Sequence, residues 1–558
     1  MVSVLAGGSA VALARRLERL TPDQRAAATA EPGPILCVAP AGSGKTTTLI
    51  ARVCWLIGSG RAAPEEVTAV TFNKRAADEL AARLATALGE IVDPAPTVRI
   101  RTFHALAREI LRDRGRPVEP LVDRFEVLRS VRPDADPAEL GRLDTAISRL
   151  KLDLAVTAQQ VAADPDAGPT ARAFVDYERA VAATGGLDFD DLLVRVLDLL
   201  DADDPPGRAA LARWRERCGH LLVDEAQDLD RSQLRLALLL AAPANRVFLV
   251  GDDDQSIYGW RLADVRRLLS LAETALPGLR RVDLVTNFRC PAPVIERSVR
   301  LVEHNAERFA KTILARDGAS GRLLLARSNG DDVDRIEGVI RSWPDDGASR
   351  AVLARTNREL VPAAMAAVRL GLPFAAADLE LPAESAIVDE LLAAAAGGET
   401  GPLLGRLARA GVPSALEGAG ATDRREAVRA IRAAMLGWAV PFRDLAAFAA
   451  SIEATRAAIT GLRREAAALT LATAHATKGL EFDHVAVIGL EAGRFPSARS
   501  IADSPDPARA LEEERRLAYV AWTRARRSLT LLFDPGAPSR FLLEAFDPDE
   551  LALVPTGD

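Results

Sequence analysis

The sequence predicts an α/β protein in which two parallel-sheet regions are each interrupted by a mainly helical segment. Short apolar runs such as ILCVA, HLLV and RVFLV are each followed by polar or acidic residues. This pattern is typical of buried parallel strands whose ligand lies at their carboxyl edge. Long Ala-, Leu- and Arg-rich stretches without strand patterns lie between the sheet regions, and these predict helical insertions.

These patterns divide the chain of 558 residues into four parts. The run RVDLVTNFR is expected to begin the second sheet region. The expected parts are a first α/β domain at 1–105 and 188–280, a helical insertion at 106–187, a second α/β domain at 281–382 and 466–558, and a reduced helical insertion at 383–465.

The composition is that of an ordinary soluble globular protein, with 49% hydrophobic and 27% charged residues, which excludes global disorder and a collagen-like repeat. The net charge of −7 excludes a histone-like coat of positive charge, although a local basic groove remains compatible with it. The four cysteines are far apart and have no zinc or iron–sulfur spacing, so we expect reduced thiols.

No apolar run reaches the ~18–20 residues that a membrane span needs, so no membrane partner is expected. The apolar segment Val2–Ala14 is followed, not preceded, by arginines, whereas a secretory signal peptide has its positive charges first. These observations predict a cytoplasmic protein.

Lysine is rare: of 71 basic residues, only Lys45, Lys74, Lys151, Lys311 and Lys478 are lysines. A compact ammonium and a planar guanidinium differ in the geometry of the contacts they make. We therefore hypothesise that lysine is kept mainly where arginine cannot replace it.

The segment Ala39-Pro-Ala-Gly-Ser-Gly-Lys-Thr46 has the form of a P-loop, between an apolar strand and a helix. In such a loop, backbone N–H groups surround the phosphates, Lys45 reaches the β- and γ-phosphate oxygens, and Thr46 holds Mg²⁺. Ala39 replaces the first glycine of the general pattern. The expected ATP-binding residues of this loop are Gly42, Ser43, Gly44, Lys45, Thr46 and Thr47.

The segment Val223-Asp-Glu-Ala-Gln-Asp228 follows a second strand pattern. Asp224 is expected to hold Mg²⁺, directly or through water, and Glu225 to accept the proton of an attacking water. Together with the P-loop, this segment predicts hydrolysis of a nucleoside triphosphate. Kinases, transporters, GTPases and motors share that chemistry, so these two motifs alone do not choose between them.

Further segments, in order along the chain, resemble the motifs of superfamily 1 helicases of the UvrD/Rep/PcrA type. The similarity runs from Thr21 to about Phe541 and leaves out 383–465. It implies two RecA-like P-loop motor domains, with ATP and Mg²⁺ as cofactors. The second helical insertion is shorter than is usual in that family.

The resemblance assigns further residues to the nucleotide. Thr21-Pro-Asp-Gln24 resembles the Q motif, with Gln24 on the adenine edge, although a helix cap is the alternative. Phe288 would stack on adenine and Glu481 would hold the ribose. Three residues would act at the γ-phosphate, the last two as arginines reaching across a cleft: Gln255, Arg289 and Arg524.

The resemblance also implies contacts with a nucleic acid strand, mainly through rings that stack on bases. For Tyr258, Trp260, Phe189 and His475 the alternative is packing in a core. Whether Lys74 or Arg75 contacts phosphate is open, and Leu262 stands where the family usually has glycine. The expected strand-contact residues are Phe72, Thr102, His104, Phe189, Tyr258, Trp260, Arg261, Thr473 and His475.

The implied function is an ATP-dependent 3′→5′ DNA helicase or translocase that acts on single-stranded DNA and single/double-strand junctions, in DNA repair or replication restart. One alternative is a single-stranded DNA translocase that displaces proteins with little unwinding. Others are a motor subunit of a larger repair complex and a non-catalytic subunit. The preference for DNA over RNA comes from the resemblance alone, because stacking does not distinguish them.

Overall fold

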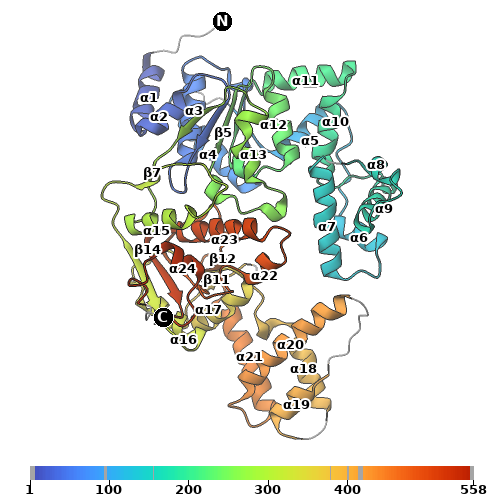
Figure 1. The fold of residues 1–558 in the computed structure, drawn as a ribbon, viewed down its shortest axis with the longest axis vertical. Coiled ribbons are helices and arrows are strands. Elements are labelled where there is room, and N and C mark those ends of the chain that lie inside the picture. Colours follow the sequence, from blue (N-terminus) through green and yellow to red (C-terminus); the bar gives the residue numbers. More distant parts are fainter. Residues whose placement is uncertain are drawn as a thin grey trace, which may run out of the picture. The chain divides into compact units, whose positions relative to one another are not determined.

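The structure is a computed structural model that describes residues 7–92, 97–154, 156–377, 379–398, 401–411 and 419–552. The chain forms two compact units, coloured along the sequence in Figure 1. The first unit comprises Met1–Pro133, Leu140–Phe288 and Asn305–Asp317, and the second comprises Asp134–Glu139, Arg289–His304 and Gly318–Asp558. Each unit contains one six-stranded sheet.

All neighbouring strands of the first sheet run parallel, in the order β3-β2-β4-β5-β1-β6. Alternate residues of the central strand β1 enter different cores, Leu36 and Val38 one and Ile35 and Cys37 the other. The sheet is therefore covered on both faces, which explains its nearly continuous apolar strands. The strands are β1 (Ile35–Val38), β2 (Val67–Thr71), β3 (Arg99–Thr102), β4 (His220–Val223), β5 (Val247–Gly251) and β6 (Arg280–Asp283).

Helices of the first unit lie on both faces of this sheet, except those within residues 124–183, labelled α6 to α9, which form a group of their own to the right in Figure 1. The helices of this unit are α1 (Gly7–Glu18), α2 (Pro22–Thr29), α3 (Lys45–Gly58), α4 (Lys74–Gly89), α5 (Phe103–Asp113), α6 (Arg124–Val131), α7 (Pro137–Leu152), α8 (Ala158–Ala162), α9 (Pro169–Ala183), α10 (Asp191–Asp201), α11 (Pro205–Arg217), α12 (Arg231–Ala241), α13 (Val265–Leu269) and α14 (Leu271–Thr274).

Two expected boundaries differ in the structure. Helix α5 falls mostly inside the expected insertion, yet Leu106 and Ile110 pack in a core of the first sheet. The run RVDLVTNFR was expected to begin the second domain, and this is wrong. Its strand β6 pairs in parallel with β1, with Arg280 opposite Ile35, because β1 would otherwise be an edge strand.

The second sheet is also parallel throughout, in the order β11-β12-β10-β13-β14-β9. Two parallel sheets of this kind give two RecA-like α/β domains, and the predicted fold class is confirmed. The strands are β9 (Arg322–Arg327), β10 (Arg350–Ala354), β11 (Phe374–Ala375), β12 (Leu469–Thr473), β13 (Phe482–Val487) and β14 (Ala525–Phe533).

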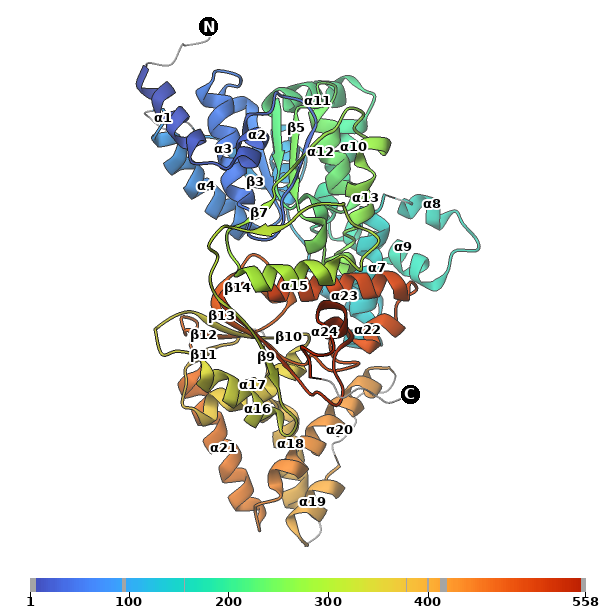
Figure 2. The ribbon, with the colours of Figure 1, turned by 60° about the vertical axis from the view of Figure 1, so that its left-hand side comes forward.

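Helices cover both faces of the second sheet, with α15 and α23 on one side and α16 and α17 on the other (Figure 2). Within the described part of 383–465, four α-helices share a core of their own, which includes Leu391, Met435 and Phe448. The helices are α15 (Ala292–Val302), α16 (Asp332–Ser342), α17 (Asn357–Arg369), α18 (Ala386–Gly397), α19 (Leu403–Arg409), α20 (Ala419–Ala439), α21 (Leu445–Leu462), α22 (Ala498–Ala502), α23 (Pro507–Trp522) and α24 (Arg540–Ala545).

The segment Asn305–Asp317 returns to the first unit, although the residues on either side of it belong to the second. Its strand β8 (Leu314–Ala315) pairs in parallel with β7 (Thr286–Asn287). Within the described ranges, no helix is both long and apolar enough to span a membrane.

Candidate nucleotide and nucleic-acid sites

The predicted P-loop lies between β1 and α3, and helix α3 begins at Lys45. Gly44 has a left-handed φ of 86°, and a Cβ there would lie 2.7 Å from Gln24 Nε2. No side chain caps the start of α3, and the buried Ser43 Oγ has no hydrogen-bond partner among the described residues. Free N–H groups at a helix start, beside a lysine and an unsatisfied hydroxyl, fit an anionic phosphate chain.

Three residues from two segments hold this loop by hydrogen bonds to its carbonyl oxygens. Asn287 Nδ2 donates to Ala41 O at 2.5 Å, and the Phe288 N–H donates to Gly42 O at 2.9 Å. Gln24 Nε2 donates to Ser43 O at 2.8 Å. The structure thus brings Phe288, which is partly exposed, next to the loop that was expected to bind the phosphates.

Gln24 also closes a capping box at the start of α2. Its Oε1 accepts from the Thr21 N–H at 3.2 Å, and its own N–H donates to Thr21 Oγ1 at 3.4 Å. The helix-cap alternative is therefore present in the structure. The role of Gln24 in binding the adenine edge stays a prediction. The Gln24 side chain is held against the P-loop by its hydrogen bond to Ser43 O.

The predicted acidic pair lies directly after β4. Glu225 Oε2 is 3.8 Å from Lys45 Nζ, so the structure brings the predicted base and the P-loop lysine together. Glu225 has a φ of 52°, a left-handed backbone that is strained for a residue with a side chain. Burial and the neighbouring Glu225 raise the pKa of Asp224, while Lys45 partly offsets this.

These groups fit a magnesium ion. Mg²⁺ prefers hard oxygen ligands, which the Thr46 hydroxyl and the Asp224 carboxylate offer. The pKa of Asp224 is raised by its burial and by the negative charge of Glu225, and a cation bound there would favour the ionised carboxylate.

Gln227 joins the acidic segment to the segment that follows β5, and the sequence reasoning missed it. Its Nε2 donates to Glu225 Oε2 at 2.7 Å, and its Oε1 accepts from the Asp252 N–H at 3.0 Å. Asp252 Oδ2 in turn accepts from Gln255 Nε2 at 2.6 Å. The predicted phosphate sensor and the predicted base are therefore joined through the Gln227 side chain and through Asp252, by its backbone N–H and its carboxylate.

Three of the predicted nucleotide residues lie in the second unit. Arg289 Nε donates to Glu481 Oε2 at 2.7 Å, and Arg526 also pairs with Glu481. Burial raises the pKa of Glu481, but the two arginines outweigh it and the net pKa is lowered. Arg524 is only 1% exposed and donates to Val520 O at 2.8 Å.

Four of the predicted strand-contact residues gather beside each other. The rings of Phe72 and Tyr258 stack at 5.1 Å, although their segments follow different strands. Trp260 lies edge-on to Tyr258 at 6.2 Å and is 54% exposed. The Arg261 guanidinium lies 4.6 Å from the Trp260 ring centre. An exposed ring beside a cation is suited to stacking on a base.

A second group joins α5 to the turn before α10. The rings of His104 and Phe189 stack at 4.0 Å, and Phe189 is 55% exposed, so it is not a core residue. Burial lowers the pKa of His104 to about 4, which leaves the ring neutral at pH 7. Thr102 caps α5 by accepting from the Ala105 N–H at 3.2 Å.

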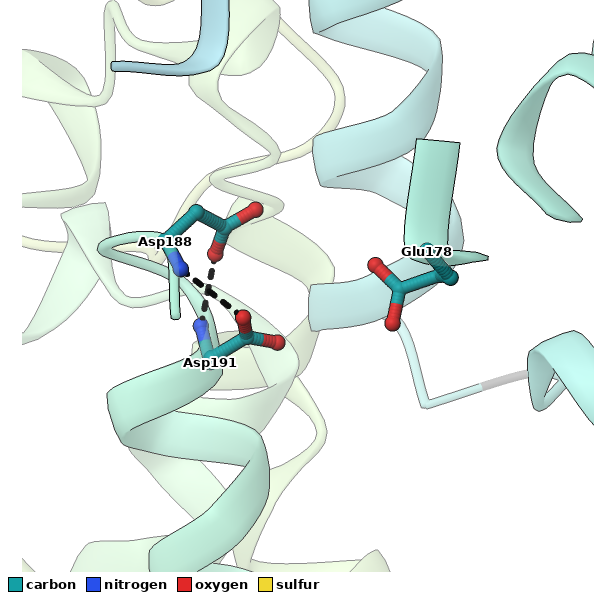
Figure 3. Close-up of side chains that lie close together, drawn as sticks. All are labelled: Glu178, Asp188 and Asp191. Atoms are coloured by element: carbon teal, nitrogen blue, oxygen red, sulfur yellow. Dashed lines mark hydrogen bonds between the residues drawn. The ribbon is translucent and has the colours of Figure 1, made fainter. Parts of the chain in front are cut away.

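The carboxylates beside Phe189 surround a buried lysine. Asp188 and Asp191 exchange hydrogen bonds with each other's backbone N–H, and Glu178 approaches from α9 (Figure 3). Lys151 Nζ lies 2.8 Å from Glu178, 2.9 Å from Asp188 and 2.6 Å from Asp191. Its ammonium supplies the positive charge, so these carboxylates are not a metal site.

Lys151→Met is expected to lower the free energy of unfolding by ~3–5 kcal/mol, because the buried Asp191 carboxylate loses its ammonium partner, although Arg124 still pairs with Asp188. Burial lowers the pKa of Lys151, but the three carboxylates raise it by more, so the ammonium is charged in the fold. Denaturant unfolding would measure the loss, with Lys74→Met, at an exposed lysine, as the matched control. Equal stabilities of the two variants would contradict a supporting role for Lys151.

The remaining predicted strand contacts, Thr473 and His475, lie at the end of β12 and just after it. Thr473 ends β12, and His475 begins a short 3-10 helix, His475–Thr477. Burial, with Arg355 and Lys478 nearby, lowers the pKa of His475 to about 4. Lys74 and Arg75 are both exposed, so their alternative stays open. Leu262 has a φ of 70°, a conformation that favours glycine.

Comparisons with known proteins agree with these features. Residues 20–275 match the family model described as the UvrD/REP helicase N-terminal domain, and residues 441–534 match the UvrD-like helicase C-terminal domain. The ATP-dependent DNA helicase PcrA of Staphylococcus epidermidis is 29% identical over 62% of this chain and 49% of its own length. The chain thus spans about half the length of that relative.

Two other relatives match over nearly the whole chain. DNA helicase II of Escherichia coli is 27% identical over 93% of this chain and 84% of its own length. PcrA of Leuconostoc citreum is 26% identical over 92% of this chain and 83% of its own length. These similarities include both α/β domains.

Proposed function

The chain belongs to the UvrD/Rep helicase family of superfamily 1, and from that premise we propose that it is an ATP-dependent DNA motor. It hydrolyses ATP on single-stranded DNA, moves 3′→5′ and separates duplex DNA at single/double-strand junctions. The cellular setting that suits this activity is DNA repair or replication restart.

The observation that carries the proposal is the connected set of polar groups around the P-loop. Lys45 and Glu225 lie within 3.8 Å, and Gln227 and Asp252 join Glu225 to Gln255. A cation for the phosphates, a base for water and a polar sensor are the groups that phosphoryl transfer to water needs.

In the proposed reaction, Lys45 and the first N–H groups of α3 bind the phosphate chain of ATP. Glu225 accepts a proton from the attacking water, and Gln255 contacts the γ-phosphate. A magnesium ion held by Thr46 and Asp224 would neutralise phosphate charge. The family resemblance assigns Arg289 and Arg524, from the second unit, to the charge that develops on the γ-phosphate.

Strand binding is assigned mainly to stacking. Tyr258, Trp260 and Phe189 offer rings to successive bases without reading a sequence. This suits a motor that must pass over any sequence, and it suits a chain with a net charge of −7.

The test is ATP hydrolysis measured without nucleic acid, with single-stranded DNA and with single-stranded RNA. Strong stimulation by DNA supports the proposed motor. Stimulation by RNA alone would move the assignment to an RNA motor, and the absence of stimulation by either polymer would overturn the proposal.

A translocase that displaces proteins with little unwinding is the second candidate. The feature that favours it is the small helical region, α18 to α21, where the family usually has a longer insertion. A forked duplex with a 3′ single-stranded tail separates the two functions, because a translocase hydrolyses ATP on it without releasing the strand. A motor subunit of a larger repair complex would gain unwinding only when its partners are present.

Trp260→Ala is expected to weaken binding of single-stranded DNA by ~5–150-fold, since one base stack contributes ~1–3 kcal/mol. Fluorescence anisotropy with a labelled oligonucleotide would measure the affinity. Phe125→Ala, which removes another exposed ring from α6, serves as the control and is expected to bind like the parent protein. Equal affinities of all three proteins would remove Trp260 from the strand-contact residues.

A further inference from the structure

The segment Asn305–Asp317 carries a lysine whose side chain is almost completely buried. The Lys311 side chain is 1% exposed, and its Nζ lies against the three carboxylates that follow β5. It is 2.9 Å from Asp252 Oδ1, 2.5 Å from Asp253 Oδ1 and 2.9 Å from Asp254 Oδ2. All three aspartates are themselves fully buried.

Neighbouring groups of the same segment reinforce this contact. Arg308 donates twice to the Asp254 carboxylate, at 3.1 Å and 2.9 Å. The Phe309 N–H donates to Asp253 Oδ2 at 2.8 Å. Burial lowers the pKa of Lys311, but the aspartates raise it by more, so Lys311 stays charged. The returning segment is therefore bound to the residues after β5 by two cations and a backbone donor.

Asp252 links this contact to the nucleotide site. One of its carboxylate oxygens accepts from Lys311 and the other accepts from Gln255 Nε2, at 2.6 Å. A carboxylate bonded on both oxygens has one orientation, and that orientation fixes the Gln255 amide. Through Gln227, Asp252 is also joined to Glu225.

We propose that Lys311 is a positioning residue for ATP hydrolysis, which acts through Asp252 on Gln255. The inference rests on the proposed function, and it adds a residue outside the nucleotide motifs. It also ties Gln255 to the chain segment that connects the second unit back to the first.

The chemistry requires lysine at this position. An ammonium presents three N–H donors around one point, which matches three carboxylate oxygens converging at 2.5–2.9 Å. A planar guanidinium spreads its donors in a fork and cannot direct three of them to that point. Lys311→Arg therefore keeps the charge but displaces Asp252.

The test compares steady-state ATP hydrolysis of the full-length protein and its variants at saturating single-stranded DNA. Lys311→Met and Lys311→Arg are both expected to lower kcat by ~10–100-fold, because a small misplacement of a reacting group has effects of that size. The KM for ATP is expected to stay within about 3-fold, because the P-loop contacts are unchanged. A purely structural role would lower the amount of folded enzyme for each variant but leave kcat per folded molecule unchanged.

Arg335→Met is the matched control for loss of a buried cation. Arg335 lies on α16 in the second unit and pairs with Asp332 at 2.7 Å and Glu491 at 2.9 Å. This variant is expected to lose stability while its kcat, per folded molecule, stays unchanged. The folded fraction of each variant is measured by circular dichroism, so that Lys311→Arg still tests the proposal when Lys311→Met does not fold.

A double-mutant cycle with Gln255→Ala tests the route of the effect. If Lys311 acts through Gln255, adding Lys311→Met or Lys311→Arg to Gln255→Ala lowers kcat no further. Fully additive losses, or a kcat for both Lys311 variants equal to that of Arg335→Met, would overturn the inference. A parent protein without DNA-stimulated hydrolysis would instead reject the proposed function, so the two failures are distinguishable.

Discussion

Lys45→Ala is expected to lower DNA-stimulated ATP hydrolysis by ~10³-fold or more. Lys45 begins α3 at the P-loop and lies beside Glu225, and the proposed function assigns its ammonium to the β- and γ-phosphates. Binding of single-stranded DNA is expected to persist, because the strand-contact rings are on other segments. Hydrolysis by release of phosphate and DNA affinity by anisotropy are the two measurements.

Lys45→Arg is the informative companion to this variant. It keeps the positive charge, yet we expect hydrolysis to be nearly lost, because the site needs a compact point charge and not a fork. Turnover near that of the parent protein would show that lysine at this position reflects composition alone. Unchanged hydrolysis in Lys45→Ala would show that the P-loop is not the nucleotide site.

Glu225→Gln is expected to lower kcat by ~10²–10⁴-fold, the range for loss of a general base. The amide keeps the shape of the side chain but cannot accept a proton from water. ATP binding is expected to be retained, since the loop, Lys45 and Thr46 are unchanged. Single-turnover hydrolysis and equilibrium binding of a fluorescent ATP analogue separate the two effects.

The control for this substitution is Glu79→Gln, at an exposed carboxylate on α4. It is expected to hydrolyse ATP like the parent protein. If Glu225→Gln retained more than about a tenth of the parent kcat, the general base would have to be a different group, since the loss would fall below the range for a general base.

Local patterns were sufficient to predict much of the fold. The strand–loop–helix around Lys45 and the acidic turn after β4 were both evident, because each depends on neighbours in sequence. The edge strand β6 was assigned to the wrong domain. The residues of RVDLVTNFR do not indicate that this strand pairs with β1, which lies about 245 residues earlier in the chain.

The candidate site also has a part that could be predicted from local sequence and a part that could not. The motif residues around the P-loop and the acidic turn were predicted, but their connection through Gln227 and Asp252 depends on two loops meeting in space. Gly251 carried a signal, since a Cβ there would lie 2.5 Å from Gln227 Oε1. The sequence shows the glycine, but only the folded structure shows that the side chain close to it is that of Gln227.

The lysine hypothesis gained a physical basis that the sequence could not supply. Lys151 and Lys311 are each surrounded by three carboxylates, an arrangement suited to an ammonium. Their partners are distant in sequence, so the spacing of the lysines gave no indication of them. Lys74 is exposed and remains unexplained.

The burial of these lysines has a practical consequence for labelling. The side chains of Lys151 and Lys311 are 3% and 1% exposed and stay protonated, and a protonated amine is not a nucleophile. Lys45 is 14% exposed, and Lys478 is partly buried. Of the five lysines, Lys74 alone is exposed, so its side chain, at the start of α4, is the lysine amine most open to an amine-reactive dye.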